Sequence, residues 1–503
     1  MRIACVLLIF AGLLGAQAPP AAPAPPTPPA AEKKPPEEKS SRTEHSVRIG
    51  GQEIRYTATA GTINLKKDDG AVTAGIFYIA YTKKDVADPA RRPLTFCFNG
   101  GPGSSSVWLH LGALGPKRVL MTPDGAPTPP PYRLVDNEFS ILDATDLVFI
   151  DPVSTGYSRA ATEQDAKKFH GVSTDVQSVA EFIRLYTSRN ARWASPKLLA
   201  GESYGTTRAA ALSGYLQESL GMNLNGIMLI SSVLHFGTLS FDPGNDMPYT
   251  LFLPTYTATA WYHKRLPKDL QGDRKKALEE AEAFAIGEYN TALMKGAGLT
   301  AEEQARVAQK MARLTGLSQR FIELSNLRVP IFAFTKELLR DRRRTVGRFD
   351  SRMEGIDATG TGTAPEYDPS YAAVQGPYTG TWNQYVRTDL KFESDLPYEI
   401  LTGRVRPWSY DQYQNRYVNV AETLREAMTQ NASLKVFVGN GYYDLATPYF
   451  ATLYTFNHLG LDPTLRGNVS MGYYDAGHMM YVHQPSLEKL KQDLGGFITK
   501  VAH

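Results

Sequence analysis

This 503-residue chain has almost no excess of charge of either sign. Its 54 lysines and arginines nearly balance its 51 aspartates and glutamates, which leaves a formal net charge of +3. Because no segment carries a dominant basic run, nothing indicates a nucleic-acid partner. The glycine-rich turn at 99–103 lacks the Gly-Lys-Ser/Thr ending of a phosphate loop. We expect neither an organic cofactor nor a metal.

Long apolar runs are also missing, apart from one near the start of the chain. Residues 3–14 form an apolar run that is shorter than the roughly 20 residues needed to cross a bilayer. Arg2 precedes this run and the small residues Ala16 and Ala18 follow it, which is typical of a secretory signal cleaved after Ala18. We therefore expect a secreted or periplasmic protein with no stable membrane insertion once the signal is removed.

Cysteine is nearly absent, and this limits how the exported chain is stabilised. The sequence has two cysteines, Cys5 and Cys97. Cys5 lies inside the expected signal, so the processed chain retains Cys97 alone. One cysteine cannot close an internal disulfide. With 42% hydrophobic residues, the fold must be stabilised by its apolar core.

The pattern of the remaining chain predicts the α/β class. Residues 19–44 are rich in Pro and Ala and are interpreted as a disordered linker. Short alternating runs up to about residue 85 then predict antiparallel strands. Further on, apolar runs typical of buried strands alternate with helical patterns. These runs lie at 94–98, 147–150, 198–200, 225–230, 434–438 and 469–474. Such alternation predicts a mostly parallel central sheet with helices on both faces.

The block between residues 235 and 407 interrupts this alternation. Amphipathic patterns at 274–293 and 301–314 predict two helices, and Thr300 and Glu303 form a capping box for the second. A Gly-, Tyr- and Pro-rich stretch at 347–382 shows no clear periodicity. We therefore divide the folded chain into three parts. These are a core segment at 45–234, a largely helical cap insertion at 235–407 and a second core segment at 408–503.

The sequence Gly201-Glu202-Ser203-Tyr204-Gly205 matches the pattern G-x-S-x-G. The pattern alone is common, but here it follows a short apolar strand and opens a helix, as a nucleophile elbow requires. The flanking glycines leave room for the strained turn that exposes the serine hydroxyl. We predict that Ser203 is the nucleophile of an α/β-hydrolase fold.

A general base and its acid partner must lie after the serine, at the carboxyl ends of later strands. His478 follows the last apolar run and is predicted as the base, while His483 and His458 are less well placed. Asp444 follows the preceding run and is predicted to hold the tautomer of His478. Asp475 is the alternative acid, but it lies on the same strand end as His478.

The loop Asn99-Gly100-Gly101 follows the first buried strand. In this architecture that loop donates one backbone N–H to the oxyanion hole, and the residue after the nucleophile donates the other. We assign these two donors to Gly101 and Tyr204. The glycines allow the backbone to approach a substrate closely.

Together these motifs resemble the serine carboxypeptidase family, in a secreted, bacterial-type form. Four blocks carry the resemblance in the family's order, at 99–105, 151–158, 201–205 and 477–479, and the block at 439–444 fits less closely. The resemblance implies a peptidase that releases single residues from peptides with a free C-terminus. It also implies that the inserted block is the family's helical cap.

The resemblance further implies that Asn99, Gly100 and Glu202 bind the terminal carboxylate of the substrate. Two ionised carboxylates at close range repel each other, so Glu202 and the bound carboxylate are expected to share a proton. We therefore expect activity on peptides to be favoured at acidic pH.

Several positions depart from the family pattern, including the residues that follow Tyr204 and the block that contains Asp444. Ser104 stands where many relatives have a cysteine, and Cys97 stands where a tryptophan is usual. Arg208 is unusual after the elbow; it could affect substrate choice or lie on the helix surface, and both interpretations are open.

The alternatives to a carboxypeptidase are an esterase or acyltransferase on the same fold and a non-catalytic exported binding protein. Glu202 and Asn99 argue against an esterase, because an ester substrate has no terminal carboxylate.

Overall fold

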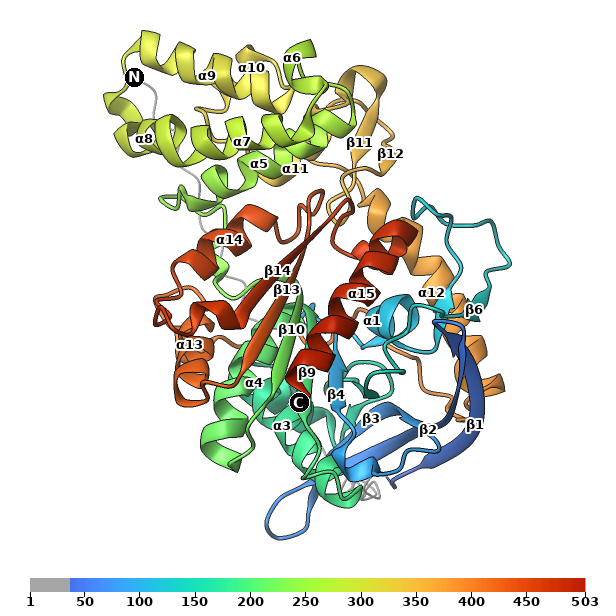
Figure 1. Cartoon of the computed structure of the whole chain (residues 1–503). Coiled ribbons are helices and arrows are strands. Elements are labelled where there is room, and N and C mark those ends of the chain that lie inside the picture. Colours follow the sequence, from blue (N-terminus) through green and yellow to red (C-terminus); the bar gives the residue numbers. More distant parts are fainter. Residues whose placement is uncertain (1–36, 503) are drawn as a thin grey trace, which may run out of the picture. The chain divides into compact units, whose positions relative to one another are not determined.

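The computed structural model describes residues 37–502. The expected signal at 1–18 and the first part of the expected linker, up to residue 36, lie outside the described residues. The fold is built on a ten-stranded sheet with the order β1-β2-β3-β7-β4-β9-β10-β13-β14, with β8 paired to β3 (Figure 1). Its strands are β1 (Ser40–Ile49), β2 (Gln52–Lys66), β3 (Val72–Lys83), β4 (Leu94–Phe98), β7 (Asp146–Ile150), β8 (Arg159–Ala160), β9 (Lys197–Ser203), β10 (Gly226–Ser232), β13 (Lys435–Gly441) and β14 (Val469–Tyr474).

The pairings from β7 to β14 are parallel, and those that involve β1, β2, β3 and β8 are antiparallel. The central strands are buried on both faces. In β7, Leu147 and Phe149 join one hydrophobic cluster, while Val148 and Ile150 join another, as the two-residue period of a strand requires. The predicted fold class is therefore confirmed.

Helices cover both faces of the sheet (Figure 1). The first cluster is completed by α1 (Val107–Leu109), α12 (Pro369–Thr388) and α15 (Gln484–Val501). The second is completed by α3 (Val172–Arg189), α4 (Tyr204–Leu220) and α13 (Ala421–Gln430). A parallel sheet of this kind places the carboxyl ends of its central strands at one edge, where the predicted site residues follow them.

The folded part begins earlier than the sequence predicts. The linker was expected to reach residue 44, but β1 starts at Ser40 and pairs with β2 from Ser40 opposite Gly61 onward. The first residues of β1 alternate between exposed and half-buried positions. A half-exposed edge strand of polar residues carries little apolar signal, which explains the wrong boundary.

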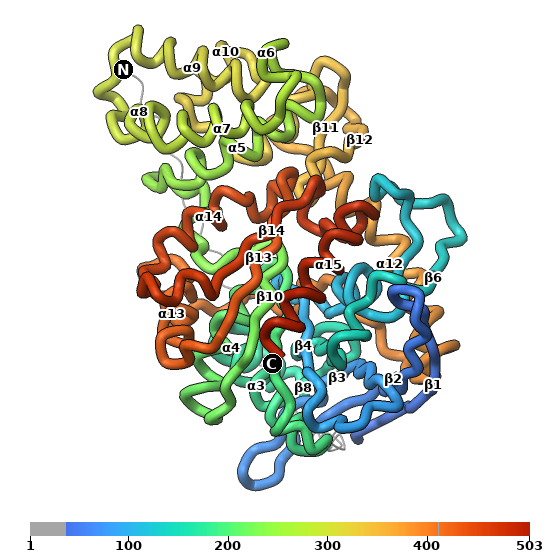
Figure 2. Tube along the Cα trace, in the orientation of Figure 1, coloured from blue at the N-terminus to red at the C-terminus, as the bar shows by residue number. Residues whose placement is uncertain are grey.

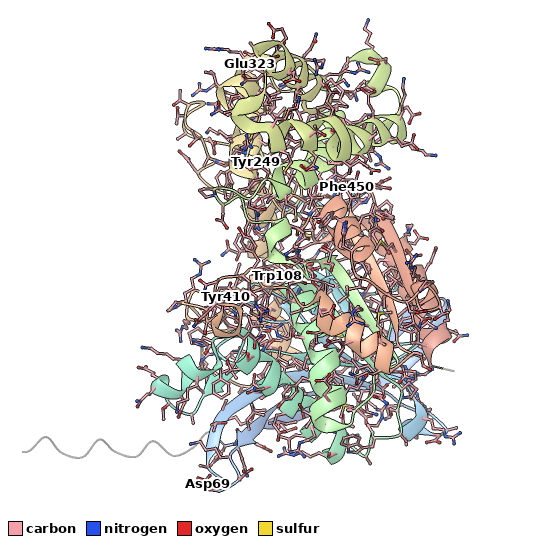
Figure 3. All side chains as sticks on the ribbon, turned by 90° about the vertical axis from the view of Figure 1, so that its left-hand side faces the viewer. Asp69, Trp108, Tyr249, Glu323, Tyr410 and Phe450 are labelled. Carbon is pink, nitrogen blue, oxygen red and sulfur yellow. The ribbon has the colours of Figure 1, made fainter. Side chains whose placement is uncertain are left out.

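The cap is a separate helical layer built by the chain after β10. Its helices are α5 (Met247–Tyr262), α6 (Lys268–Gln271), α7 (Arg274–Phe284), α8 (Asn290–Lys295), α9 (Ala301–Thr315), α10 (Gln319–Leu324) and α11 (Ile331–Glu337). They share a third hydrophobic cluster with α14 (Tyr449–Asn457), to which Tyr249 and Phe450 in Figure 3 contribute. No helix in the described part of the chain is long and apolar enough to cross a membrane.

The two predicted cap helices are present with one modification. The first is divided into α7 and α8 by a wider helical turn at 285–289. The second is α9, and its capping box is confirmed. The Thr300 hydroxyl accepts from the Glu303 N–H at 3.2 Å, and the Glu303 carboxylate accepts from the Thr300 N–H at 3.1 Å.

The last part of the expected cap belongs to the main core instead. After the hairpin of β11 (Arg344–Val346) and β12 (Glu354–Ile356), the chain returns to the sheet as α12, which Figure 2 shows in orange beside the lower part of the molecule. Val374, Tyr378 and Trp382 are spaced by four residues and pack in the first cluster. The many Gly, Pro and Tyr residues of this stretch obscured that helical period in the sequence.

A buried ion pair fixes the start of α4. Arg208 is 1% exposed, and its Nε donates to Oδ2 of Asp175 in α3 at 2.7 Å. Its Nη1 donates to the carbonyl of Asn99 at 2.7 Å. The guanidinium therefore connects α4, α3 and the end of β4. Both sequence-based interpretations of Arg208 are wrong, because the side chain is neither on the helix surface nor accessible to a substrate.

Substitution of this arginine should destabilise the protein strongly. Arg208→Met leaves the Asp175 carboxylate buried without its partner, so the free energy of unfolding should fall by about 3–5 kcal/mol. Arg425→Met is a matched control, because Arg425 pairs with Glu422 at the exposed surface of α13. Urea unfolding followed by circular dichroism measures both. Equal effects of the two substitutions would contradict a structural role for the buried pair.

Candidate active site

The nucleophile elbow is formed as the sequence predicts. Ser203 is the last residue of β9 and Tyr204 is the first of α4. Ser203 has φ 60° and ψ −130°, a conformation that is rarely populated by residues other than glycine. A Cβ atom on Gly201 would lie 2.2 Å from the carbonyl oxygen of Gly205. A side chain at residue 201 would therefore force the turn open.

His478 and Asp444 lie together at the ends of β14 and β13. The Nδ1 atom of His478 is 2.8 Å from Oδ2 of Asp444. Asp444 is fully buried, and its Oδ1 accepts from the N–H groups of Ala446 and Thr447 at 2.7 and 2.9 Å. The Thr447 hydroxyl donates to Oδ2. Because Nδ1 faces Asp444, the other ring nitrogen, Nε2, is free to exchange a proton with a nucleophile.

The pKa of His478 reflects two opposing effects. Burial lowers the pKa because it disfavours the charged imidazolium. The charge of Asp444, the hydrogen bond to it and the charge of Glu202 act in the opposite direction and prevail, so the pKa is raised above its usual value.

The alternative residues from the sequence have other contacts. Asp475 forms an ion pair with Arg274 at 2.6 Å. The Nδ1 atom of His483 lies 2.8 Å from the hydroxyl of Ser486, at the start of α15. The Nδ1 atom of His458 lies 2.8 Å from the carbonyl of Tyr454. None of these three residues lines the pocket that contains Ser203.

The loop after β4 meets the elbow at very short range. A Cβ atom on Gly100 would lie 2.4 Å from the Tyr204 nitrogen, so only glycine fits there. As the first residue of α4, Tyr204 has an N–H group without a partner inside the helix. The Oδ1 atom of Asn99 accepts from the N–H of Leu109 at 3.0 Å, which fixes the side-chain amide. Gly101 follows with φ 102°.

Glu202 is buried beside Ser203 with 3% of its surface exposed. Tyr481 donates a hydrogen bond to its Oε2 at 2.6 Å. Burial raises the pKa of Glu202 to about 7, although the charge of His478 and hydrogen bonds from Tyr481 and Asn99 act against this shift. A carboxyl group with this pKa is largely protonated below neutral pH.

These residues share one pocket of about 410 Å³. Its lining includes six of the eight predicted site residues: Asn99, Gly100, Gly101, Glu202, Ser203 and His478. Asp444 lies behind His478, and Tyr204 contributes its backbone at the base of the elbow. In residues 37–502, no cluster of His, Cys, Asp or Glu has the arrangement of a metal site.

His478 is held from the other side by residues that no sequence pattern marks. The Phe349 ring stacks on the His478 ring with 5.0 Å between centroids and 14° between planes. The Phe349 carbonyl accepts from the His478 N–H at 2.6 Å, and Asp350 accepts from the N–H of Gly477 at 3.1 Å. Arg348 and Arg406 also line the pocket. They lie in irregular segments, where no periodicity marks them.

The chain has the fold of an α/β-hydrolase. Its mixed sheet carries a serine at a strained strand–helix turn, and an Asp–His pair follows on later strands. The family model described as serine carboxypeptidase matches residues 51–483. The chain therefore belongs to the serine carboxypeptidase family.

Individual relatives are distant. The pheromone-processing carboxypeptidase KEX1 of Coprinopsis cinerea is 32% identical over 162 residues, which are 31% of this chain and 24% of that protein. The match to KEX1 of Yarrowia lipolytica covers 29% of that protein. Serine carboxypeptidase-like 34 of Arabidopsis thaliana is 23% identical over 440 residues, which are 84% of this chain and 78% of that protein.

The crystal structure of Kex1, a prohormone-processing carboxypeptidase from Saccharomyces cerevisiae, has the same fold. It superposes with a TM-score of 0.55 and 17% identity, over 88% of this chain and 91% of that one.

The contact between His478 and Asp444 predicts how the pKa of His478 responds to mutation. In Asp444→Asn the pKa should fall, because the anion that stabilises the imidazolium is removed. Asp475→Asn is the control and should leave the pKa in place, because Asp475 pairs with Arg274 instead. Histidine ring NMR resonances, assigned with His478→Gln, report both values. A larger fall in Asp475→Asn would reverse the choice of acid.

Proposed function

We propose that this protein is a serine carboxypeptidase that removes C-terminal residues from peptides, and that its chain is exported after cleavage behind Ala18. The observation that carries the enzymatic part is Glu202, a buried carboxyl group with a raised pKa that lines the same pocket as Ser203. A group of this kind suits a substrate that ends in a carboxylate. Family membership and the fold support the same activity.

The proposed reaction begins with attack on the last peptide bond. The Ser203 hydroxyl transfers its proton to Nε2 of His478 as its oxygen bonds to the carbonyl carbon. Asp444 stabilises the resulting imidazolium through Nδ1. The N–H groups of Gly101 and Tyr204 stabilise the negative oxygen of the tetrahedral intermediate, where one such donor contributes about 3 kcal/mol.

The intermediate then collapses. The C–N bond breaks as His478 returns the proton to the departing amine, which leaves an ester of the shortened peptide on Ser203. Water attacks this ester and gives a proton to His478. When the bond to Ser203 breaks, His478 protonates the serine oxygen and the shortened peptide leaves.

Glu202, Asn99 and Gly100 are proposed to bind the terminal carboxylate of the substrate. A protonated Glu202 donates a hydrogen bond to this carboxylate, whereas an ionised Glu202 repels it. Because its pKa is raised to about 7, the protonated form dominates at acidic pH.

The proton on Glu202 also affects the base. The Glu202 anion raises the pKa of His478, and a charged His478 lowers the pKa of Glu202. Protonation of Glu202 therefore removes one of the charges that keep a proton on His478. The proposed reactive state has both groups neutral, and acidic pH favours it until His478 itself becomes protonated.

The test compares a blocked dipeptide that has a free C-terminus with its C-terminal amide, from pH 5 to pH 8. We expect the free acid to be preferred by about 10- to 100-fold at acidic pH, because a charge-assisted hydrogen bond is lost in the amide. In the wild type, kcat/KM for the free acid should fall as the pH rises from 7 to 8, because Glu202 ionises over this range. Ser203→Ala should lower kcat by about 10⁶-fold.

Two glutamine substitutions sharpen this test. Glu202→Gln cannot ionise, so its activity should lose the decline above pH 7. Glu282→Gln should keep the decline, because Glu282 lies outside the pocket, although it too is bonded to a tyrosine and has a raised pKa. Equal cleavage of acid and amide would contradict the carboxypeptidase. Turnover of simple esters without peptides would favour an esterase, and failure of a fluorophosphonate to label Ser203 would favour a binding protein.

A further inference from the structure

The pocket around Ser203 carries more positive charge than the proposed mechanism needs. Arg348 and Arg406 both line it, and among its lining residues, all in the described part of the chain, Glu202 is the only carboxylic acid. Glu202 is largely neutral below pH 7 because burial raises its pKa to about 7. The pocket therefore presents two guanidinium groups with little negative charge of its own.

Arg348 is half-buried and lacks the ion pair that four other buried or half-buried arginines form. Arg92, Arg192, Arg208 and Arg352 each form an ion pair with an aspartate. Within residues 37–502, the Arg348 guanidinium has no carboxylate at ion-pair distance, and it lies 5.4 Å over the ring of Phe349. A guanidinium that is partly removed from water without an anion is energetically unfavourable. An anionic ligand in the pocket would offset this cost.

The nearest acids to Arg348 are already engaged. The Asp368 Oδ1 atom caps α12 and accepts from the N–H groups of Arg348 and Ser370 at 3.1 and 3.0 Å. Asp444 accepts from His478 and Thr447. These carboxylates support the charge of Arg348 from a distance, but they do not neutralise it.

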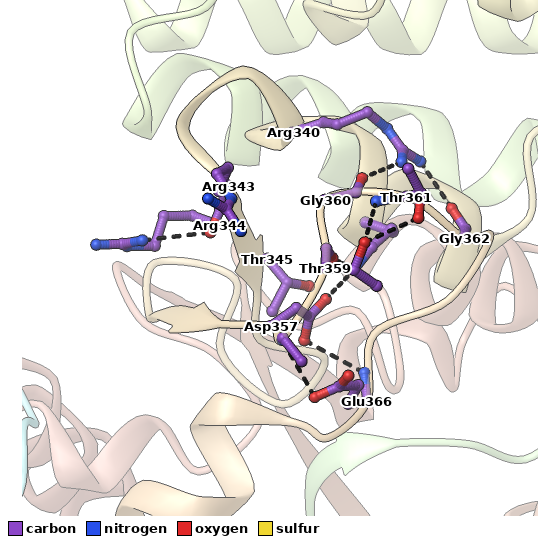
Figure 4. A network of polar contacts seen from close by, with 12 residues as sticks. Arg340, Arg343, Arg344, Thr345, Asp357, Thr359, Gly360, Thr361, Gly362 and Glu366 are labelled. Atoms are coloured by element: carbon purple, nitrogen blue, oxygen red, sulfur yellow. Dashed lines mark hydrogen bonds and ion pairs between the residues drawn. The ribbon is translucent and has the colours of Figure 1, made fainter.

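The backbone of Arg348 is held firmly in place. Its N–H donates to Asp368, and its carbonyl accepts from the N–H of Leu445 at 3.1 Å. Arg348 lies between β11 and β12, and the segments before β11 and after β12 are joined by hydrogen bonds. Figure 4 shows the Arg340 guanidinium reaching the carbonyls of Gly360 and Gly362. The backbone at Arg348 is therefore fixed independently of any substrate.

Arg406 lies on a different loop of the pocket lining. Its loop is joined to the loop after β4, because the Thr402 N–H donates to the Gly103 carbonyl at 3.0 Å. Arg406 is exposed at the rim of the pocket. Its charge is screened by solvent more than that of Arg348, so its contribution is the smaller of the two.

We propose that Arg348, assisted by Arg406, makes the enzyme prefer peptides whose C-terminal residue is acidic, either Asp or Glu. The inference rests on the proposed carboxypeptidase function. In that function the departing residue lies between His478, which protonates its amine, and Glu202, which binds its α-carboxylate. Arg348 adjoins His478 through Phe349. A guanidinium in this position would donate a pair of hydrogen bonds to a side-chain carboxylate.

The test uses blocked dipeptides in matched pairs at pH 6, where side-chain carboxylates are ionised and Glu202 is mainly protonated. One pair ends in Ala-Glu or Ala-Gln, and the other ends in Glu-Ala or Gln-Ala. For the wild type we expect kcat/KM to be about 10- to 100-fold higher for Ala-Glu than for Ala-Gln. Arg348→Gln should bring this ratio close to one, and Arg348→Lys should retain part of it. Arg406→Gln should reduce it less.

Arg320→Gln is the control, because Arg320 is exposed on α10 in the cap and lies outside the pocket lining. It should keep the wild-type ratio. Labelling of Ser203 by a fluorophosphonate, together with a thermal melt, shows that each variant retains its folded site.

Several results would overturn the inference. These are a wild-type ratio near one, a ratio unchanged by Arg348→Gln, or an acidic preference confined to the penultimate residue. An equal loss for the Glu- and Gln-terminated peptides in Arg348→Gln would instead mean that Arg348 binds the α-carboxylate. Hydrolysis of Ala-Gln by the wild type separates these outcomes from a failure of the carboxypeptidase function itself.

Discussion

The close approach between Gly100 and the N–H of Tyr204 governs the arrangement around Ser203. No side chain fits at residue 100, because its first atom would lie 2.4 Å from the Tyr204 nitrogen. The contact exists because β4 and β9 are neighbouring parallel strands that end at the same edge of the sheet. It brings Asn99 and Glu202 into one pocket with the serine. From behind, Arg208 holds the carbonyl of Asn99 and Asp175 together, so the buried pair maintains the same constraint.

Two carboxyl groups near His478 have contrasting surroundings. Asp444 accepts hydrogen bonds from two backbone N–H groups, a hydroxyl and the imidazole, which suits a carboxylate. Glu202 is also buried but receives a hydrogen bond from Tyr481, and its pKa is raised to about 7. The surroundings of Asp444 therefore orient the imidazole, whereas those of Glu202 favour its protonated form. In the proposed mechanism, the partner of His478 and the acid that binds the carboxylate can then both lie near His478.

The regular parts of the fold and the strand-end residues could be predicted from the sequence. Buried strands and amphipathic helices have clear periods, and Ser203, Asp444 and His478 each follow such a strand. The irregular parts could not be predicted. The stretch at 347–382 shows no readable period, yet it supplies Phe349 against His478 and the helix α12 against the core. Arg208 gave a wrong expectation because burial of a cation depends on a distant partner, Asp175, and the local sequence does not reveal it.

The difference between the site residues that could be predicted and those that could not reflects how the pocket is built. The groups assigned to bond making and proton transfer stand on sheet strands or directly after them, where parallel pairing fixes their separation. Arg348 and Arg406 stand on the segments that join the cap to the core, and these segments are fixed by individual hydrogen bonds to Asp368, Leu445 and Gly103. Such loops can change residue without disturbing the sheet. In the proposed function, substrate selection can therefore vary at Arg348 and Arg406 while the strands around Ser203 stay constant.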